Sequence, residues 1–178
     1  HESCDYKIES TIVRHVKGKK KECSVEDILE AEKNEYNLFR RDVFKTEWLH
    51  NKPQKTDEML FAMSIGRHLG LPCRLIDVTA SLETAIWFAV MNPKFHNVDG
   101  EIILIYLGKN DVLETNQSPF NATKLSYAHE PFMTDSLSDL PLGEQRRFVQ
   151  NGHFIWVDNN SLLNEEQVIL KSATALIR

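Results

Sequence analysis

Two charged residues, Arg74 and Asp77, interrupt an otherwise apolar run from Cys73 to Val78. Burying a polar side chain without a partner costs about 1–3 kcal/mol or more, so each residue needs a partner or a ligand cleft. A spacing of three on a predicted strand puts them on opposite faces, so they cannot pair across one face. Two interpretations follow: a buried salt-bridge network that ties the strand to the preceding helix, or direct contact with a ligand.

His68, at the end of that preceding helix, is a second candidate. Imidazole titrates near neutral pH and can transfer protons, although a lone histidine also serves as a hydrogen-bonded structural residue, so both roles stay open. His129 with Glu130, and also His153, lack a metal-ligand spacing, and we predict no metal site. Cys4, Cys23 and Cys73 contain no Cys-x-x-Cys pair, which favours reduced thiols in a cytoplasmic protein.

The composition restricts the class of protein. The chain has 178 residues, of which 42% are apolar and 26% charged, with a net charge of −5. These values predict one globular domain over residues 1–178, and a start at His1 without a signal-like segment indicates a piece of a longer chain. No stretch reaches the ~18–20 apolar residues of a membrane helix. The net acidity disfavours nucleic acid as a partner, although the lysine run at 17–21 leaves a weaker nucleic-acid hypothesis open.

The elements that position these residues follow from caps and periodicity. Ser24 caps a predicted helix to about Lys33, a second helix capped by Thr56 should stop at Gly70, and Ser81 caps a third that spans 82–91. Strands are predicted over 36–39, 73–78, 101–107, 153–157 and 167–170, with a long polar loop over 108–143. Trp87 and Phe88 are predicted to be core residues. The predicted fold is an α+β domain with a mixed, mostly antiparallel sheet flanked by helices.

The segment GRHLGLPCRLIDVTASLETAIWFAV, residues 66–90, resembles the signature of the FRG domain family. That signature reads His-x-Gly-x-Pro-Thr-Arg-Leu-Leu-Asp-Trp-Thr and continues into an Ala-x-x-Phe-Ala helix. The positions that agree are His68, Gly70, Pro72, Arg74, Leu75, Asp77, Thr79, Ala85, Phe88 and Ala89. LFRRD around Arg40 resembles the family's opening Phe-Arg-Gly, and Arg146, Gln150, Gly152 and Phe154 resemble its later block. Arg41, Cys73 and Val78 depart from the family's glycine, threonine and tryptophan.

The order of these blocks is also similar to the Arg, Ser-Thr-Ser, Glu-x-Glu plan of mono-ADP-ribosyltransferases. This resemblance implies that Arg40, on an aromatic-Arg strand, contacts the diphosphate of NAD, while Thr79 and Ser81 brace the nicotinamide-ribose pocket. It also implies a late carboxylate that stabilises an oxocarbenium-like transition state. Gln167 stands where the plan has its glutamate, and a neutral amide cannot replace that carboxylate. Glu165 or Glu166 serves if the strand register differs by one or two residues.

The two resemblances together imply an ADP-ribosyltransferase-like fold with NAD or a related nucleotide as ligand or substrate. The expected cleft is lined by Arg40, His68, Arg74, Asp77, Thr79, Ser81 and Gln150, with Arg146 facing it. The alternative is a recognition or regulatory module that binds a nucleotide or a protein partner without turnover, because the acid has been lost. The family resemblance further implies a bacterial context in toxins or phage defence, with a protein as acceptor.

Overall fold

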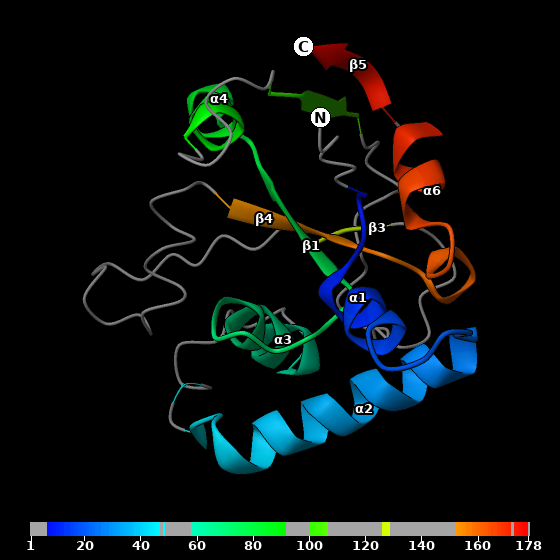
Figure 1. The fold of residues 1–178 in the computed structure, drawn as a ribbon. Helices are drawn as coiled ribbons and strands as arrows, with labels where there is room; N and C mark the ends of the chain where they lie inside the picture. Colours follow the sequence, from blue (N-terminus) through cyan, green and yellow to red (C-terminus); the bar gives the residue numbers. More distant parts are fainter. Residues whose placement is uncertain are drawn as a thin grey trace.

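The computed structural model describes residues 7–46, 48, 58–91, 100–106, 126–128, 152–171 and 173–177. Helix α2 runs along one side of the molecule next to α1 and α3, whereas α4, β2 and β5 lie at the opposite end (Figure 1). In chain order, the elements are α1 (Thr11–Lys17), α2 (Val25–Asp42), α3 (Glu58–His68), β1 (Leu75–Thr79), α4 (Leu82–Val90), β2 (Ile102–Ile105), β3 (Ser126–Ala128), β4 (Gly152–Trp156), the 3-10 turn η6 (Asn159–Ser161), α6 (Glu165–Lys171) and β5 (Ala173–Ile177).

The described strands form two antiparallel sheets. One sheet has the order β1-β4-β3, and the other pairs β2 with β5. Strand β1 is aligned with β4 so that Leu75 lies opposite Trp156 and Thr79 opposite Gly152. The predicted α+β class is therefore confirmed, with two small sheets where a single mixed sheet was expected. Among the described helices, none is both long and apolar enough to cross a membrane.

Helix α2 corrects the prediction for residues 24–39. The cap at Ser24 is confirmed, since its side chain accepts a hydrogen bond from the backbone of Asp27 in a capping box. The helix then continues to Asp42, and the predicted end at Lys33 and strand over 36–39 are wrong. Ile28, Glu32 and Phe39 are buried on one helical face, so packing on the core outweighs the β-propensity of the aromatic residues.

The C-terminal segment contains the second correction. Residues 167–170 belong to helix α6, so the predicted strand is wrong, and the strand of this region is β5. Glu165 and Ile169 are both buried, and a spacing of four places them on the same face of a helix. The helical period of burial therefore determines the structure here, although Val168 and Ile169 are β-branched residues.

Other predicted elements agree with the structure. Helix α3 ends at His68, and Gly70 follows with a φ of 94°. Ser81 caps α4, and β1, β2 and β4 overlap the predicted strands. Trp87 and Phe88 were predicted as core, but 52% and 47% of their surfaces are exposed, so this prediction is wrong. The Thr56 cap and the loop predicted over 108–143 lie outside the described residues, apart from β3.

The core consists of two clusters. The larger one packs α2 and α3 against the β1-β4 sheet, with Phe39, Phe61, Leu75 and Trp156 among its members. The smaller one packs α1 and the start of α2 against the segment that follows β4. Apolar packing of this kind supplies most of the stability of a domain this size. The larger cluster contains residues of both α3 and β1 and fixes these two elements relative to each other, and the candidate site lies where they meet.

Candidate functional site

A cavity of about 640 Å³ opens between the end of α3, β1 and α4. The described side chains that give it chemical character are Arg67, His68, Asp77, Thr79, Ala85 and Phe88. Gly152 and His153, at the start of β4, also line it. The cavity thus combines a guanidinium, two imidazoles, a carboxylate and a hydroxyl with an apolar wall.

The end of α3 positions Arg67 and His68. The helix stops because Gly70 adopts a positive φ, which residues with a side chain rarely do. The backbone N–H of Leu71 then donates to the carbonyl of Gly66 at 2.7 Å. A Cβ added to Gly66 would lie 2.6 Å from Leu71 Cδ2, so the absence of a side chain allows this tight reversal. The chain therefore leaves the helix directly toward β1.

The alternation of β1 brings Asp77 and Thr79 to the cavity. Side chains along a strand alternate between faces, so Leu75, Asp77 and Thr79 share one face. Leu75 is fully buried on the core, and the other two lie beyond it at the cavity. Asp77 is paired with Phe154, and Gly152 stands opposite Thr79 with no side chain to occupy the space.

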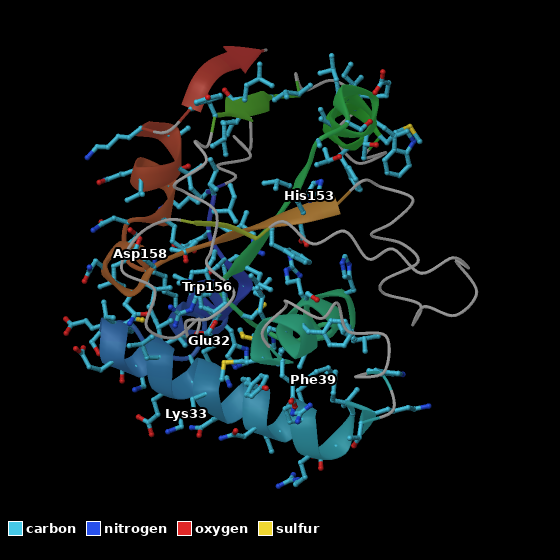
Figure 2. The ribbon with its side chains drawn as sticks, turned by 180° about the vertical axis from the view of Figure 1, so that it is seen from behind. Glu32, Lys33, Phe39, His153, Trp156 and Asp158 are labelled. Carbon is cyan, nitrogen blue, oxygen red and sulfur yellow. The ribbon has the colours of Figure 1, made fainter. Side chains whose placement is uncertain are left out.

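His153 belongs to the other face of this sheet. It is paired with Val78, and cross-strand partners share a face, so its side chain starts opposite to that of Asp77. It also lines a neighbouring cavity of about 350 Å³ together with Ile103 and Ile155. Figure 2 labels His153 near the start of β4. His68 is consequently the imidazole on the Asp77 side, and its ring packs against Phe154 with a centroid distance of 5.7 Å.

An ion pair joins two of the residues that line the cavity. Arg67 Nη2 lies 2.5 Å from Asp77 Oδ2, and the two side chains are 22% and 49% exposed. The Nε atom of Arg67 is buried and has no hydrogen-bond partner among the described residues. Exposed ion pairs stabilise a fold by only about 0–1 kcal/mol. Separating the two partners would therefore cost little free energy.

Arg74 belongs to a buried salt-bridge network, which was one of the two roles considered for it from the sequence. Its side chain is fully buried, and Nε and Nη2 contact Glu32 Oε2 at 2.7 and 2.5 Å. Its Nη1 donates to Asn159 Oδ1 at 2.5 Å, and its guanidinium stacks 4.8 Å from the centre of the Trp156 ring. Glu32 and Trp156 lie near each other in the interior (Figure 2). Arg74 ties the start of β1 to α2, and it is not among the residues that line the cavity.

Ser81 and Thr79 are linked through the cap of α4. Thr79 Oγ1 accepts a hydrogen bond from the backbone N–H of Ser81 at 3.1 Å. Ser81 Oγ accepts from the N–H of Thr84 at 3.1 Å and donates to Glu83 Oε2 at 3.0 Å. Ser81 therefore acts as a helix cap and lines an adjoining cavity of about 480 Å³, whereas Thr79 lines both cavities.

Arg40 does not reach this site. It lies near the end of α2, where Nη2 donates to Glu58 Oε1 at 2.7 Å and the guanidinium lies 4.6 Å from the centre of the Phe44 ring. The aromatic-Arg strand expected from the transferase plan is part of a helix. The expectation that Arg40 joins Thr79 in one cleft is therefore not met, because α2 packs on the opposite side of α3.

The three late candidates, Glu165, Glu166 and Gln167, lie on α6 and not before a strand. Glu165 is buried and accepts hydrogen bonds from the backbone N–H of Ser10 and from its hydroxyl, the latter at 2.7 Å. Burial raises the pKa of the Glu165 carboxyl to about 7. Glu166 accepts from the N–H of Ile8 at 3.4 Å. These carboxyls hold the N-terminal segment, and none of the three residues is among those that line the 640 Å³ cavity.

The structure thus brings together His68, Asp77 and Thr79, places Ser81 at the adjoining cavity, and leaves Arg40, Arg74 and the α6 residues elsewhere. Arg146, Gln150, His129 and Glu130 lie outside the described residues. Within the described part, no group of three His, Cys, Asp or Glu side chains is placed to hold a metal ion. Sequence reasoning missed Arg67. Its signal was a basic residue in the last turn of the helix, ten positions before an aspartate on the next strand.

The fold and site define a small α+β domain with a charged cavity at a helix–strand junction. The FRG domain model matches residues 1–97, more than half of the chain, and the chain belongs to the FRG domain family. The matched part contains α1 to α4 and every cavity residue except Gly152 and His153. Comparison with curated proteins and with solved structures gives no match.

Proposed function

We propose that this FRG domain binds NAD or a related nucleotide in the cavity between α3, β1 and α4. The observation that carries the proposal is the position of Arg67, 22% exposed, at a cavity of about 640 Å³. A guanidinium is planar and permanently charged, and it can bind two phosphate oxygens at once. Small-molecule sites have volumes of about 300–1,000 Å³, so the cavity has the size of a nucleotide site.

The remaining walls fit the other parts of such a ligand. Ala85 and Phe88 of α4 form an apolar wall, and aromatic side chains stack on nucleobases. His68 adds positive charge near the phosphates whenever its imidazole is protonated. Each part of a nucleotide thus meets a side chain of suited chemistry.

The geometry favours binding without ADP-ribosyl transfer. Arg40 is paired with Glu58, and Glu165 is buried against Ser10. Arg40 and Glu165, which the transferase plan requires near Thr79, therefore lie on α2 and α6 and not in the cavity that Thr79 lines. The domain acts in this proposal as a recognition or regulatory module, in a cytoplasmic bacterial setting such as toxin or phage defence, with a protein partner that responds to the nucleotide.

Isothermal titration calorimetry of the purified protein with NAD and ADP tests the proposal. We expect saturable binding that Arg67→Ala weakens by about tenfold or more, since it removes a charge-assisted hydrogen bond. Arg40→Ala is the matched control, because that arginine is also paired with a glutamate but lies outside the cavity, and its affinity should equal wild type. Absence of binding by wild type, or an equal loss in both variants, overturns the proposal.

Incubation with labelled NAD tests the second part of the proposal. We expect neither transfer of the label to protein nor release of nicotinamide. Turnover that survives Arg40→Ala and Glu165→Gln would assign the chemistry to other residues and would overturn the assignment of a binding module.

A further inference from the structure

The cavity contains a carboxylate among its cationic groups. Asp77 is half exposed and lies 2.5 Å from Arg67. An ionised carboxylate only accepts hydrogen bonds, and it repels other anions. A ligand that carried only phosphate would therefore compete with Asp77 for Arg67. A ligand that suits both residues brings negative charge to Arg67 and hydrogen-bond donors to Asp77.

Arg67, Asp77 and Thr79 all line the cavity, and two of them lie on the same strand. Arg67 approaches Asp77 from α3, and Thr79 follows on the same face of β1, about 7 Å further along the strand. Thr79 is oriented by the hydrogen bond from the N–H of Ser81. Its hydroxyl is both donor and acceptor. A ligand that contacts all three residues meets a cation, an acceptor and a hydroxyl.

We infer that Asp77 binds the vicinal hydroxyls of a ribose, so that the site takes ribonucleotides in preference to deoxyribonucleotides. This inference rests on the proposed nucleotide binding. A vicinal diol offers two O–H donors, which match the two oxygens of a carboxylate. Hydrogen bonds to a charged acceptor are stronger than those between neutral groups. A site built to bind a hydroxyl rejects an analogue that lacks it, because its own acceptor then loses water without gaining a partner.

Phosphorylated sugars without a base share this chemistry. The apolar wall of Ala85 and Phe88 favours a ligand that also has a base, since a sugar phosphate would leave Phe88 uncovered. The comparison of ADP with ribose 5-phosphate separates the two classes.

Calorimetric titrations of wild type with ADP, 2′-deoxyADP and pyrophosphate test the inference. We expect ADP to bind at least about tenfold more tightly than 2′-deoxyADP. In Asp77→Asn this preference should fall below about threefold. Pyrophosphate should bind that variant several-fold more tightly than wild type, because the competing negative charge beside Arg67 is gone. A merely structural role for Asp77 would weaken all three ligands together.

Asp42→Asn is the matched control. Asp42 is also paired with an arginine, at 2.6 Å from Arg41 Nε, but it lies at the end of α2 and away from the cavity. It should retain the wild-type preference for ADP. Equal affinities of wild type for ADP and 2′-deoxyADP, or a pyrophosphate affinity equal to that of ADP, would overturn the inference and leave nucleotide or anion binding in place. Ribose 5-phosphate that binds as tightly as ADP would overturn the ribonucleotide assignment, and no binding of ADP would overturn the proposed function itself.

Discussion

The junction of α3 and β1 carries two arginine–carboxylate pairs, one at each end. Arg74 and Glu32 are both fully buried, with further hydrogen bonds from Arg74 to Asn159 and from its backbone N–H to Glu32 Oε1 at 2.8 Å. Arg67 and Asp77 form an ion pair among the residues that line a cavity, and Asp77 is half exposed. The same chemical pair therefore serves structure where it is enclosed, and where it is open to solvent we propose that it serves binding.

Removing one partner of the buried pair should give the largest effect. Glu32→Ala leaves the Arg74 guanidinium buried without its counter-charge, and we expect it to lower the free energy of unfolding by about 3–5 kcal/mol. Urea-induced unfolding followed by circular dichroism measures this change. Glu30→Ala, at an exposed position of the same helix, should change stability by less than about 0.5 kcal/mol.

The double variant Glu32→Leu with Arg74→Met sharpens this first prediction. Apolar residues of similar volume can replace a buried ion pair at little cost, so the double variant should be far more stable than Glu32→Ala. A double variant as unstable as Glu32→Ala would show that packing, and not the unpaired charge, causes the loss.

Glu165 is a buried carboxyl that accepts hydrogen bonds from Ser10, and its effect should be intermediate. Because burial raises the pKa of Glu165 in the folded state to about 7 from its ordinary value of 4.5, the folded protein holds this proton more tightly than the unfolded chain. Its contribution is fully present below about pH 4.5 and is lost as the pH rises to about 7. The loss is on the order of 3 kcal/mol.

Glu165→Gln keeps a neutral group at this position at every pH. We expect urea unfolding to show stability near wild type at pH 5 and greater than wild type at pH 8. Glu166→Gln, on the neighbouring position of α6, should retain the wild-type pH dependence. A wild-type stability that does not fall between pH 5 and pH 7 would contradict the raised pKa.

Breaking the partly exposed pair of Arg67 and Asp77 should have the smallest effect on the free energy of unfolding. Asp77→Asn is expected to change the free energy of unfolding by less than about 1 kcal/mol, since both side chains are partly solvated. The same urea experiment measures it, with Asp42→Asn as the exposed counterpart. A loss above about 2 kcal/mol would mean that this pair is structural after all, and the contrast between the two pairs would fail.

The sequence predicted those elements that have strong local signals. Gly70 ended α3 and Ser81 began α4 because a positive φ and a side-chain cap depend on one or two residues. Residues 36–39 of α2 and 167–170 of α6 were predicted as strands, since their aromatic and β-branched residues favour strands in isolation. Burial of Phe39 and Ile169 on helical faces reversed that preference.

The part of the site that was predicted correctly also depends on residues close together in the sequence. His68, Asp77 and Thr79 belong to one continuous segment, so a short helix and strand bring them together. Arg40 and Glu165 were placed by analogy with the order of motifs in another group of proteins. Order along the chain does not set distance in space, and α2 and α6 carry these residues elsewhere. Arg67 was missed because an arginine in the last turn of a helix is common and usually solvated.

Anchoring of Arg74 has a consequence for the entropy of the proposed ligand binding. Since its backbone and side chain are both bonded to Glu32, strand β1 is held from the residue before its start, and Asp77 follows only three positions later. The conformational entropy of ordering this carboxylate is lost when the chain folds and not when a ligand arrives. If a ligand binds at Asp77 as proposed, a substitution that loosens Arg74 should make the entropy of that binding less favourable, although Arg74 does not line the cavity.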